Sequence, residues 1–172
     1  MKSQLSHYQS KFNKKQFPLV LILDNVSGEA NIGSIFRLAD AFGVEKIIFC
    51  GIPPNLKSNR LKKTARNTHE YVKFEVFETT LEAAKFYQQQ NYSLFALEIT
   101  DKSIPLDSAD FTDTASLALV LGSESHGIQE EVLSLCSIVL HINMFGNNSS
   151  MNVAQAAAIA LYEITKSTTI YD

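Results

Sequence analysis

Six short apolar runs constrain the fold of this chain more strongly than any other feature of its sequence. The first, Leu19–Leu23, is apolar at every position, which is typical of a strand buried on both faces of a parallel sheet. The other five are Lys46–Cys50, Tyr71–Phe77, Ser93–Ile99, Ser116–Leu121 and Ser137–Ile142. Segments with helical periodicity lie between the runs, and this alternation predicts an α/β fold with a mainly parallel sheet flanked by helices.

Four of the intervening segments are predicted to be helices. Asn31–Phe42 has apolar residues at helical spacing and is followed by Gly43, a common helix stop. The other three predicted helices are Thr80–Gln90, Ile128–Leu135 and Asn152–Lys166. Two further stretches have the composition of linkers, namely Ile52–Asn55, which contains a pair of prolines, and Asp101–Asp110.

The last predicted helix, Asn152–Lys166, is apolar on nearly all of its faces. A helix without a polar face is usually buried. Two interpretations are open: the helix is packed tightly inside one core, or a second subunit covers it in a dimer.

The composition excludes several classes of protein. Apolar residues make up 45% of the 172 residues and charged residues 19%, which indicates a packed core rather than disorder. No apolar stretch reaches the roughly 18 residues of a membrane-spanning helix, and the polar segment 1–17 lacks the apolar centre of a signal peptide. We therefore expect a cytoplasmic protein without membrane association. Cys50 and Cys136 lie far apart without metal-ligand spacing, so neither a disulfide nor a metal site is expected.

The charge is not that of a protein that binds polyanions over its whole surface. The net charge is −3, whereas nucleic-acid-binding domains are usually strongly basic. Two local basic segments could still contact phosphates. One comprises Lys2, Lys11, Lys14 and Lys15, and the other Lys57, Arg60, Lys62, Lys63 and Arg66. The alternative for both segments is a solvated charged face without a ligand.

Three polar, glycine-bearing segments follow predicted strands, where parallel α/β sheets bind their ligands. The first runs from Asp24 to Arg37 and opens a helix. A helix start attracts anions, and an arginine such as Arg37 can hold a phosphate with two parallel hydrogen bonds. Gly28 and Gly33 do not have dinucleotide-binding spacing, and no P-loop lysine follows them. Without further context, Arg37 could equally form an exposed ion pair on its helix.

The second segment is Leu121–Ile128, which follows a fully apolar strand. Gly122 and Gly127 allow the backbone to approach a ligand or to adopt positive φ. Glu124 could accept hydrogen bonds from a ligand or cap the following helix. His126 on its own is more typical of a surface residue than of a catalyst.

The third segment is Ile142–Val153, directly before the last helix. Ser150 and Asn152 are suited to cap that helix. The apolar side chains of this segment could sandwich an aromatic base while backbone groups bind its edge; they are Ile142, Met144 and Met151.

Together and in this order, the three segments resemble the motifs of the SpoU (TrmH-like) family of the SPOUT methyltransferases. Motif one corresponds to Asn31–Gly43, with Asn31, Gly33 and Arg37. Motif two corresponds to Leu121–Gly127, and motif three to Ile142, Met144 and Ser150–Val153 with the helix that follows. The resemblance covers Leu19–Glu163. Two residues depart from the family pattern, because Met151 stands where the family has Leu and Ala154 where it has Ser.

The resemblance implies an enzyme that transfers a methyl group from S-adenosylmethionine to a ribose 2′-hydroxyl of tRNA or rRNA. The small basic footprint favours tRNA. The resemblance implies a six-stranded sheet with a deep C-terminal trefoil knot, a homodimer, and no metal. It also implies a short basic arm over residues 1–17 and one SPOUT catalytic domain over residues 18–172.

The resemblance further implies roles for individual residues. Arg37 corresponds to the catalytic arginine, which we expect to contact the RNA phosphate and stabilise the developing alkoxide while Asn31 orients it. The positions that would hold the pocket and the helix start are Glu124, Ser150 and Asn152. The expected cofactor-binding residues are Leu97, Glu98, Gly122, Gly127, Ile142, Met144 and Met151. The second basic segment, rather than the resemblance, supplies the expected RNA-binding residues Lys57, Arg60, Lys62, Lys63 and Arg66.

Two alternatives belong to other functional classes. One is an RNA-binding or cofactor-binding protein of the same fold without catalysis, which would have no use for the pair Asn31 and Arg37. The other is a flavodoxin-like phosphate binder, which would need only the α/β pattern and not the three motifs.

Overall fold

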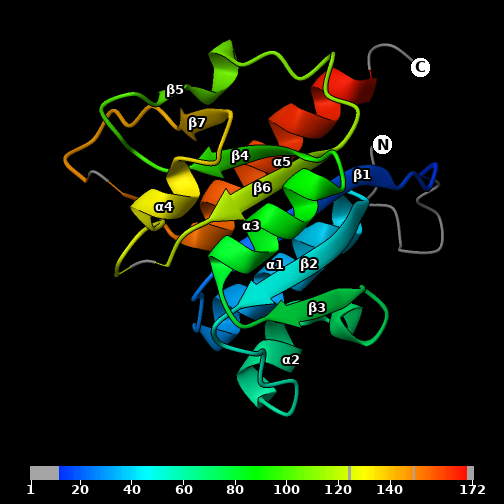
Figure 1. Cartoon of the computed structure of the whole chain (residues 1–172). Helices are drawn as coiled ribbons and strands as arrows, with labels where there is room; N and C mark the ends of the chain where they lie inside the picture. The colour runs from blue at the N-terminus through cyan, green and yellow to red at the C-terminus, as the bar shows by residue number, and fades with distance from the viewer. Residues whose placement is uncertain (1–11, 124, 149, 170–172) are drawn as a thin grey trace.

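The computed structural model describes residues 12–123, 125–148 and 150–169. Its centre is a parallel sheet with the strand order β3-β2-β1-β6-β4-β7-β5 (Figure 1). All the strand pairs are parallel. The strands are β1 (Phe17–Asp24), β2 (Val44–Cys50), β3 (Phe74–Phe77), β4 (Ser93–Leu97), β5 (Ile104–Pro105), β6 (Leu117–Leu121) and β7 (Ile138–His141).

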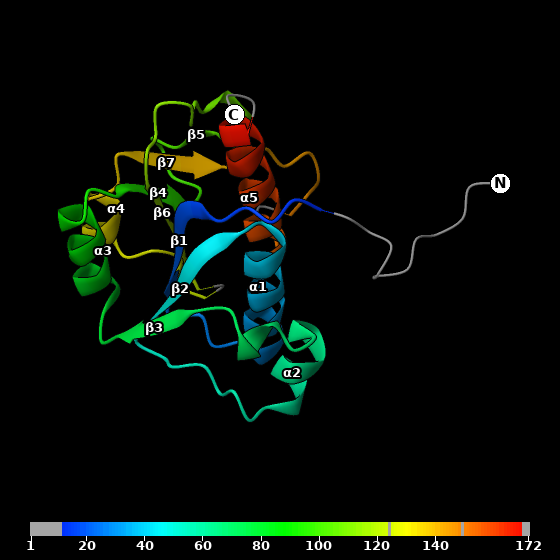
Figure 2. The ribbon, with the colours of Figure 1, turned by 90° about the vertical axis from the view of Figure 1, so that its right-hand side faces the viewer.

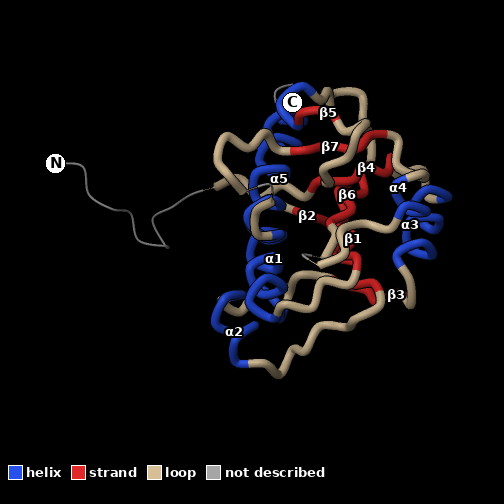
Figure 3. The backbone as a smooth tube through the Cα atoms, turned by 90° about the vertical axis from the view of Figure 1, so that its left-hand side faces the viewer, coloured by secondary structure: helices blue, strands red, loops and turns tan. Residues whose placement is uncertain are grey.

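Helices cover both faces of the sheet, as Figures 2 and 3 show from opposite sides. One face carries α1 (Glu29–Ala41), α2 (Asn59–Ala65) and α5 (Val153–Thr169). The other face carries α3 (Thr80–Gln89) and α4 (Glu130–Leu133). Two short 3-10 turns, Thr68–Glu70 and Leu106–Ser108, lie in the connections. The α/β class with a helix-covered parallel sheet is therefore confirmed.

The apolar run of β1 is buried on both sides, as its sequence predicts. Leu19, Leu21 and Leu23 pack into the core beneath α1 and α5. Val20 and Ile22 pack into the second core, beneath α3 and α4. Side chains of a strand alternate between the two faces of a sheet, so a central strand of a three-layer domain needs an unbroken apolar run.

The prediction of six strands is wrong by one, because the sheet has seven strands among the described residues. The additional strand is β5, which pairs with β7 at the edge of the sheet. A strand of two residues has no periodicity to detect, and its Pro105 is tolerated because edge strands need not donate on both sides. Asp101–Asp110, predicted as a linker, thus contributes a strand and buries Leu106 in the core.

Other element boundaries also differ from the predictions. The sequence gives no apolar signal for α2, which is the basic segment at Asn59–Ala65. The predicted helix Ile128–Leu135 is reduced to Glu130–Leu133. The predicted strand Tyr71–Phe77 begins only at Phe74, and Tyr71 is exposed.

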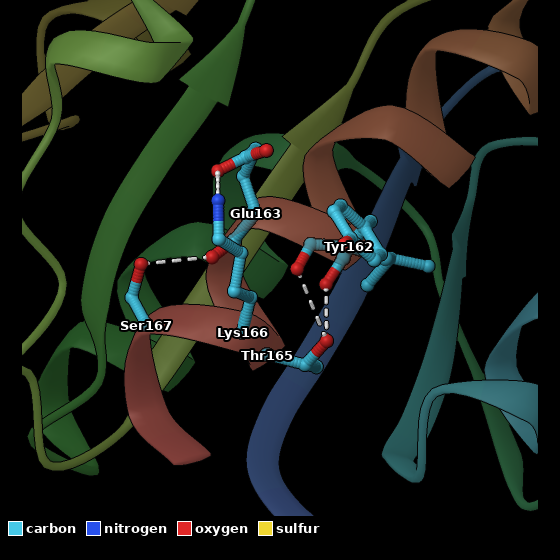
Figure 4. A network of polar contacts seen from close by, with 6 residues as sticks. Tyr162, Glu163, Thr165, Lys166 and Ser167 are labelled. Carbon is cyan, nitrogen blue, oxygen red and sulfur yellow. Dashed lines mark hydrogen bonds and ion pairs between the residues drawn. The ribbon is translucent and has the colours of Figure 1, made fainter. Parts of the chain in front are cut away.

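The last helix, α5, has a buried face and an exposed face. Ala157, Leu161 and Ile164 pack against the core, whereas Ile159 and Tyr162 are 39% and 56% exposed. Near its end, Thr165 Oγ1 donates to the carbonyl of Leu161 at 2.7 Å and Ser167 Oγ to that of Glu163 at 2.9 Å (Figure 4). Among the described residues no helix, α5 included, is long and apolar enough to cross a membrane.

Candidate functional site

The three predicted segments meet at the carboxyl end of the sheet, where the parallel strands end together. Leu121, the last residue of β6, is paired with Leu23 of β1 on one side and with Leu97 of β4 on the other. Leu97 is also level with Leu140 of β7. The loops that follow β1, β6 and β7 therefore start next to one another, as predicted from their positions after three parallel strands.

A cavity lies at this carboxyl end of the sheet, beside the last residues of β4 and β7 and the start of α5. It is lined by Leu97, Glu98, Ile99, His141, Ile142, Met144, Ser150, Met151 and Ala156. Its volume of about 110 Å³ is smaller than the roughly 300–1,000 Å³ typical of sites for complete small ligands. A larger ligand would place one part in this apolar cavity and the rest outside it.

The cavity brings together most of the residues predicted to bind a cofactor. Leu97, Glu98, Ile142, Met144 and Met151 all line it, and so does Ser150, which was assigned to the helix start. The lining residues that the sequence analysis missed are Ile99, His141 and Ala156. Ile99 and His141 each adjoin a predicted position, so extending each motif by one residue would have found them.

Gly122 and Gly127 do not line the cavity but shape the loop beside it. A Cβ atom on Gly122 would lie 2.5 Å from the carbonyl carbon of Gly127, and Gly127 itself has a φ of +64°. The amide of Gly127 donates to the carbonyl of Ser123 at 2.9 Å, which closes the loop on itself. Both glycines are therefore required by close backbone approach and positive φ.

Glu98 connects this loop to the cavity. Its carboxylate accepts from the amide of Ile99 at 2.9 Å and from that of Ile128 at 3.2 Å. A Cβ atom on Gly127 would lie 2.6 Å from the same carboxylate. The glycine thus allows a charged side chain of the cavity wall to reach the loop after β6.

Asn152 joins the third segment to the first. Its side-chain amide donates to Asn31 Oδ1 at 2.8 Å, while its oxygen accepts from the amides of Ala154 and Gln155 at the start of α5. One side chain therefore caps α5 and binds α1, two segments that are 121 residues apart in the chain. Ala154, which replaces the family's serine, is buried and forms part of the core.

Arg37 lies on the exposed side of α1. It makes no hydrogen bond or ion pair with any residue that the structure describes, so the expected contact with Asn31 is not seen. Six residues separate the two positions, which places them roughly 120° apart around the helix axis. Asn31 faces α5, whereas Arg37 lies one turn beyond Gly33, the residue that faces α2.

The close contact between α1 and α2 depends on Gly33. A Cβ atom at this position would lie 2.0 Å from Thr64 Oγ1 and 2.4 Å from the carbonyl of Leu61. The start of α2 is fixed separately, because Ser58 Oγ donates to Glu29 and accepts from the amides of Arg60 and Leu61. A cation-rich helix is thereby held beside Arg37.

The five predicted RNA-binding residues are all exposed and lie on or beside α2: Lys57, Arg60, Lys62, Lys63 and Arg66. Within the described ranges none of them forms an ion pair. Arg66 has the left-handed backbone of a helix C-cap, with a φ of +51°. The cluster is therefore an unpaired positive surface next to the first segment.

The thiols are poor nucleophiles. Burial raises the pKa of Cys50 to about 12, and burial also raises the pKa of Cys136 to about 12. Reactive cysteines have lowered pKa values. In the described part of the chain, no group of His, Cys, Asp and Glu side chains could hold a metal ion.

Some predicted residues cannot be placed. Glu124, assigned to motif two, lies outside the described residues, as do Lys2 and Lys11 of the basic arm. Next to the position of Glu124, Ser125 Oγ and His126 Nδ1 are 2.7 Å apart and both residues are exposed.

These features are those of an α/β protein that has a mainly apolar cavity and a cationic surface near the carboxyl end of its sheet. The model of the SpoU rRNA Methylase family matches residues 18–162. The chain therefore belongs to the SpoU family, as its three motifs predict.

Named relatives agree with this assignment. The chain is 28% identical over 150 residues to a tRNA (guanosine(18)-2′-O)-methyltransferase of Thermus thermophilus, covering 87% of this chain and 75% of that protein. It is 32% identical to a 23S rRNA (guanosine-2′-O-)-methyltransferase of Acinetobacter baylyi, covering 84% of this chain and 58% of the relative. The crystal structure of the A. aeolicus TrmH/SpoU tRNA modifying enzyme superimposes with a TM-score of 0.81 at 25% identity, covering 92% of this chain and 79% of that one.

Proposed function

We propose that this protein is an S-adenosylmethionine-dependent RNA methyltransferase that methylates a ribose 2′-hydroxyl. The observation that carries the proposal is that three features lie at the carboxyl end of the sheet. They are the apolar cavity, the loop bounded by Gly122 and Gly127, and helix α1, which carries Arg37. The similar proteins named above methylate the 2′-oxygen of guanosine in tRNA and in rRNA. Between these, we propose tRNA, because a basic surface of one short helix suits a compact substrate.

The cavity has the chemistry to hold S-adenosylmethionine. Ile142, Met144 and Met151 offer apolar surfaces for an adenine ring, and Glu98 offers a carboxylate for polar groups of the ligand. The cofactor supplies a methyl group that is already activated by a sulfonium. The protein therefore needs only to position the two reactants, assist loss of the hydroxyl proton and exclude water.

Arg37 is proposed to act on the RNA side of the reaction. A guanidinium has five donors and no acceptor, so the exposed Arg37 is suited to electrostatic stabilisation rather than to the role of a base. It would bind the phosphate beside the target ribose and stabilise the alkoxide that develops as the hydroxyl loses its proton. The residues Asn31 and Asn152 would hold α1 and α5 in register around this position.

We also propose a homodimer whose interface includes the exposed face of α5. Ile159 and Tyr162 lie on that face, and exposed apolar side chains grouped on a helix are typical of an interface. Sedimentation should give about twice 19.1 kDa. A monomer at high micromolar concentration would contradict the proposal.

We propose three further features on the basis of the family assignment. They are a deep C-terminal trefoil knot, a catalytic domain over residues 18–172 with a basic arm over 1–17, and a cytoplasmic location with the RNA substrates. The chain passes from β7 at one side of the sheet to α5 beside α1 (Figure 2). Unfolding a knotted chain by pulling its ends should leave it shorter than its contour length, whereas full extension would exclude a knot.

Binding of the cofactor is the first test. Calorimetry on the purified protein should detect S-adenosylmethionine with a dissociation constant in the micromolar range, about −8 kcal/mol. Met151→Ala should weaken binding because it removes apolar surface from the cavity, whereas Phe86→Ala changes an exposed side chain of α3 and serves as the control. A folded protein that takes up no cofactor at millimolar concentration would refute the proposal.

A further inference from the structure

Two carboxylates flank the loop that leaves β6. Asp24 is the last residue of β1, and Glu98 directly follows β4. Since β1 and β4 are the two neighbours of β6 in the sheet, their side chains approach the same loop from opposite sides. They accept hydrogen bonds from consecutive amides of the chain, those of Ile128 and Gln129.

Glu98 contacts the loop on the side of the cavity. One oxygen accepts from Ile128 at 3.2 Å and the other from Ile99 at 2.9 Å, so each oxygen has an amide donor. The missing side chain of Gly127 leaves the space that the carboxylate occupies.

Asp24 contacts the loop from inside the protein. It is only 2% exposed and does not line the cavity. Its Oδ1 accepts from Thr80 Oγ1 at 2.7 Å and from the side-chain amide of Asn25 at 2.8 Å, while Oδ2 accepts from Gln129 at 3.4 Å. A buried carboxylate needs such donors, and here one of them belongs to the loop.

We infer that Asp24 and Glu98 are positioning residues that fix residues 127–129, through which the chain enters α4. The amide of Gly127 closes the loop by donating to the carbonyl of Ser123, and the side chain of Ile128 is buried in the core beneath α3 and α4. The two carboxylates add polar contacts to this packing, because each accepts from a backbone amide of the returning chain. This inference rests on the proposed function only where it concerns the cofactor, since the attachment itself can be measured without any ligand.

The decisive variant is Asp24→Asn, because an amide nitrogen cannot accept from Gln129 while the oxygen serves Thr80 and Asn25. Thr80→Val is the matched control. It removes a buried donor from the same carboxylate without touching the loop. Glu98→Gln tests the contact between Glu98 and the amide of Ile128. Because Glu98 is only half-buried, this variant replaces Asp24→Asn as the main test if Asp24→Asn does not fold.

Two readouts separate positioning from general stability. Amide hydrogen exchange by NMR, without ligand, should be at least tenfold faster at Gly127, Ile128 and Gln129 in Asp24→Asn and Glu98→Gln, and unchanged there in Thr80→Val. Calorimetry with S-adenosylmethionine should show at least tenfold weaker binding for Asp24→Asn, although Asp24 lies outside the cavity.

The outcomes are distinguishable. Equal exchange at these three amides in the wild type and both carboxylate variants would overturn the inference, and so would an equal acceleration in Thr80→Val. A wild-type protein that fails to bind S-adenosylmethionine would instead overturn the proposed function and leave the exchange result to decide the inference.

Discussion

The cavity at the ends of β4 and β7 and the surface formed by α1 and α2 are built in different ways. The cavity is lined mainly by apolar side chains, and in the loop beside it the backbone of Gly122 lies close to that of Gly127. The helical surface consists of exposed cations, and its geometry depends on one close approach at Gly33. The first arrangement suits a small, partly apolar ligand, and the second suits a phosphate backbone.

Because the cavity and the helical surface consist of different residues, binding of the two ligands of the proposed reaction should be separable by mutation. Changes on the α1–α2 surface should affect RNA binding or methyl transfer and leave cofactor affinity intact. Changes at the cavity or its loop should weaken cofactor binding, and methyl transfer with it, and leave RNA affinity intact. Asn152 is the exception, because it binds α1 and caps α5 at the same time.

The largest effect is expected for Arg37. Arg37→Ala should reduce the rate of methyl transfer by about 100-fold or more, in line with loss of one preorganised group at a reacting oxygen. Arg37→Lys should fail nearly as badly, because an ammonium lacks the planar fork of the guanidinium. Single-turnover transfer of labelled methyl groups to bulk tRNA measures the rate.

Cofactor affinity provides the control for Arg37. Calorimetry should give the wild-type dissociation constant for both variants, since Arg37 does not line the cavity. Wild-type turnover in Arg37→Ala would reject the catalytic role, and loss of cofactor binding would show that the residue is structural.

A second, smaller effect should follow from Gly33→Val. The new side chain would collide with Thr64 and the carbonyl of Leu61, displacing α2 and lowering stability by about 1–3 kcal/mol. RNA affinity should fall while S-adenosylmethionine affinity stays within about twofold. Ser34→Ala, on the same helix, removes only a bond to the carbonyl of Ala30 and is the control. Equal RNA affinity in Gly33→Val would show that the placement of α2 is unimportant.

The basic surface itself can be tested by charge removal. Replacing Arg60, Lys62 and Lys63 with Gln should weaken RNA binding and reduce the salt dependence, with a slope change of up to about 3 on a logarithmic plot. The control triple variant carries Gln at Lys73, Lys85 and Lys102, which are also exposed but do not lie on α2. If both triple variants behave alike, only the net charge matters and the cluster is a solvated face.

The smallest effect on methyl transfer is expected from treatment with a reagent that alkylates cysteines. Because burial raises the pKa values of Cys50 and Cys136 to about 12, only about one thiol in 10,000 would be ionised at pH 8. A raised pKa keeps the neutral form over the whole physiological range, and the thiolate appears only as the pH approaches 12. Iodoacetamide at pH 8 should therefore leave methyl transfer unchanged, with unmodified protein by mass spectrometry. Rapid inactivation would reveal a reactive thiol.

Much of the fold could be predicted from the sequence, because burial on both faces leaves an unbroken apolar run. Leu19–Leu23 is the clearest case, and its neighbour β6 is likewise apolar and buried at every residue. β5 could not be predicted, since two residues that include Pro105 have no pattern. The helix α2 was missed because only Leu61 and Ala65 are buried, and its cations suggested a ligand surface rather than a helix.

The candidate site was predictable where a motif supplies both the backbone and the side chains. Ile142, Met144 and Met151 come from one segment, and all three line the cavity. Contacts between distant segments were not predictable from one chain, as for Asp24 with Gln129 or Asn152 with Asn31. The orientation of Arg37 away from Asn31 follows from helical geometry and could have been anticipated from their spacing of six residues.

The atom of the RNA that receives the methyl group can be identified by alkaline hydrolysis. The purified protein is incubated with methyl-labelled S-adenosylmethionine and unmodified tRNA or rRNA, and the RNA is then hydrolysed with alkali. A 2′-O-methyl group blocks cleavage of the adjacent phosphodiester, so the account predicts label in alkali-resistant dinucleotides, with tRNA the better substrate. Label recovered in mononucleotides with methylated bases, or no transfer to either RNA, would contradict it.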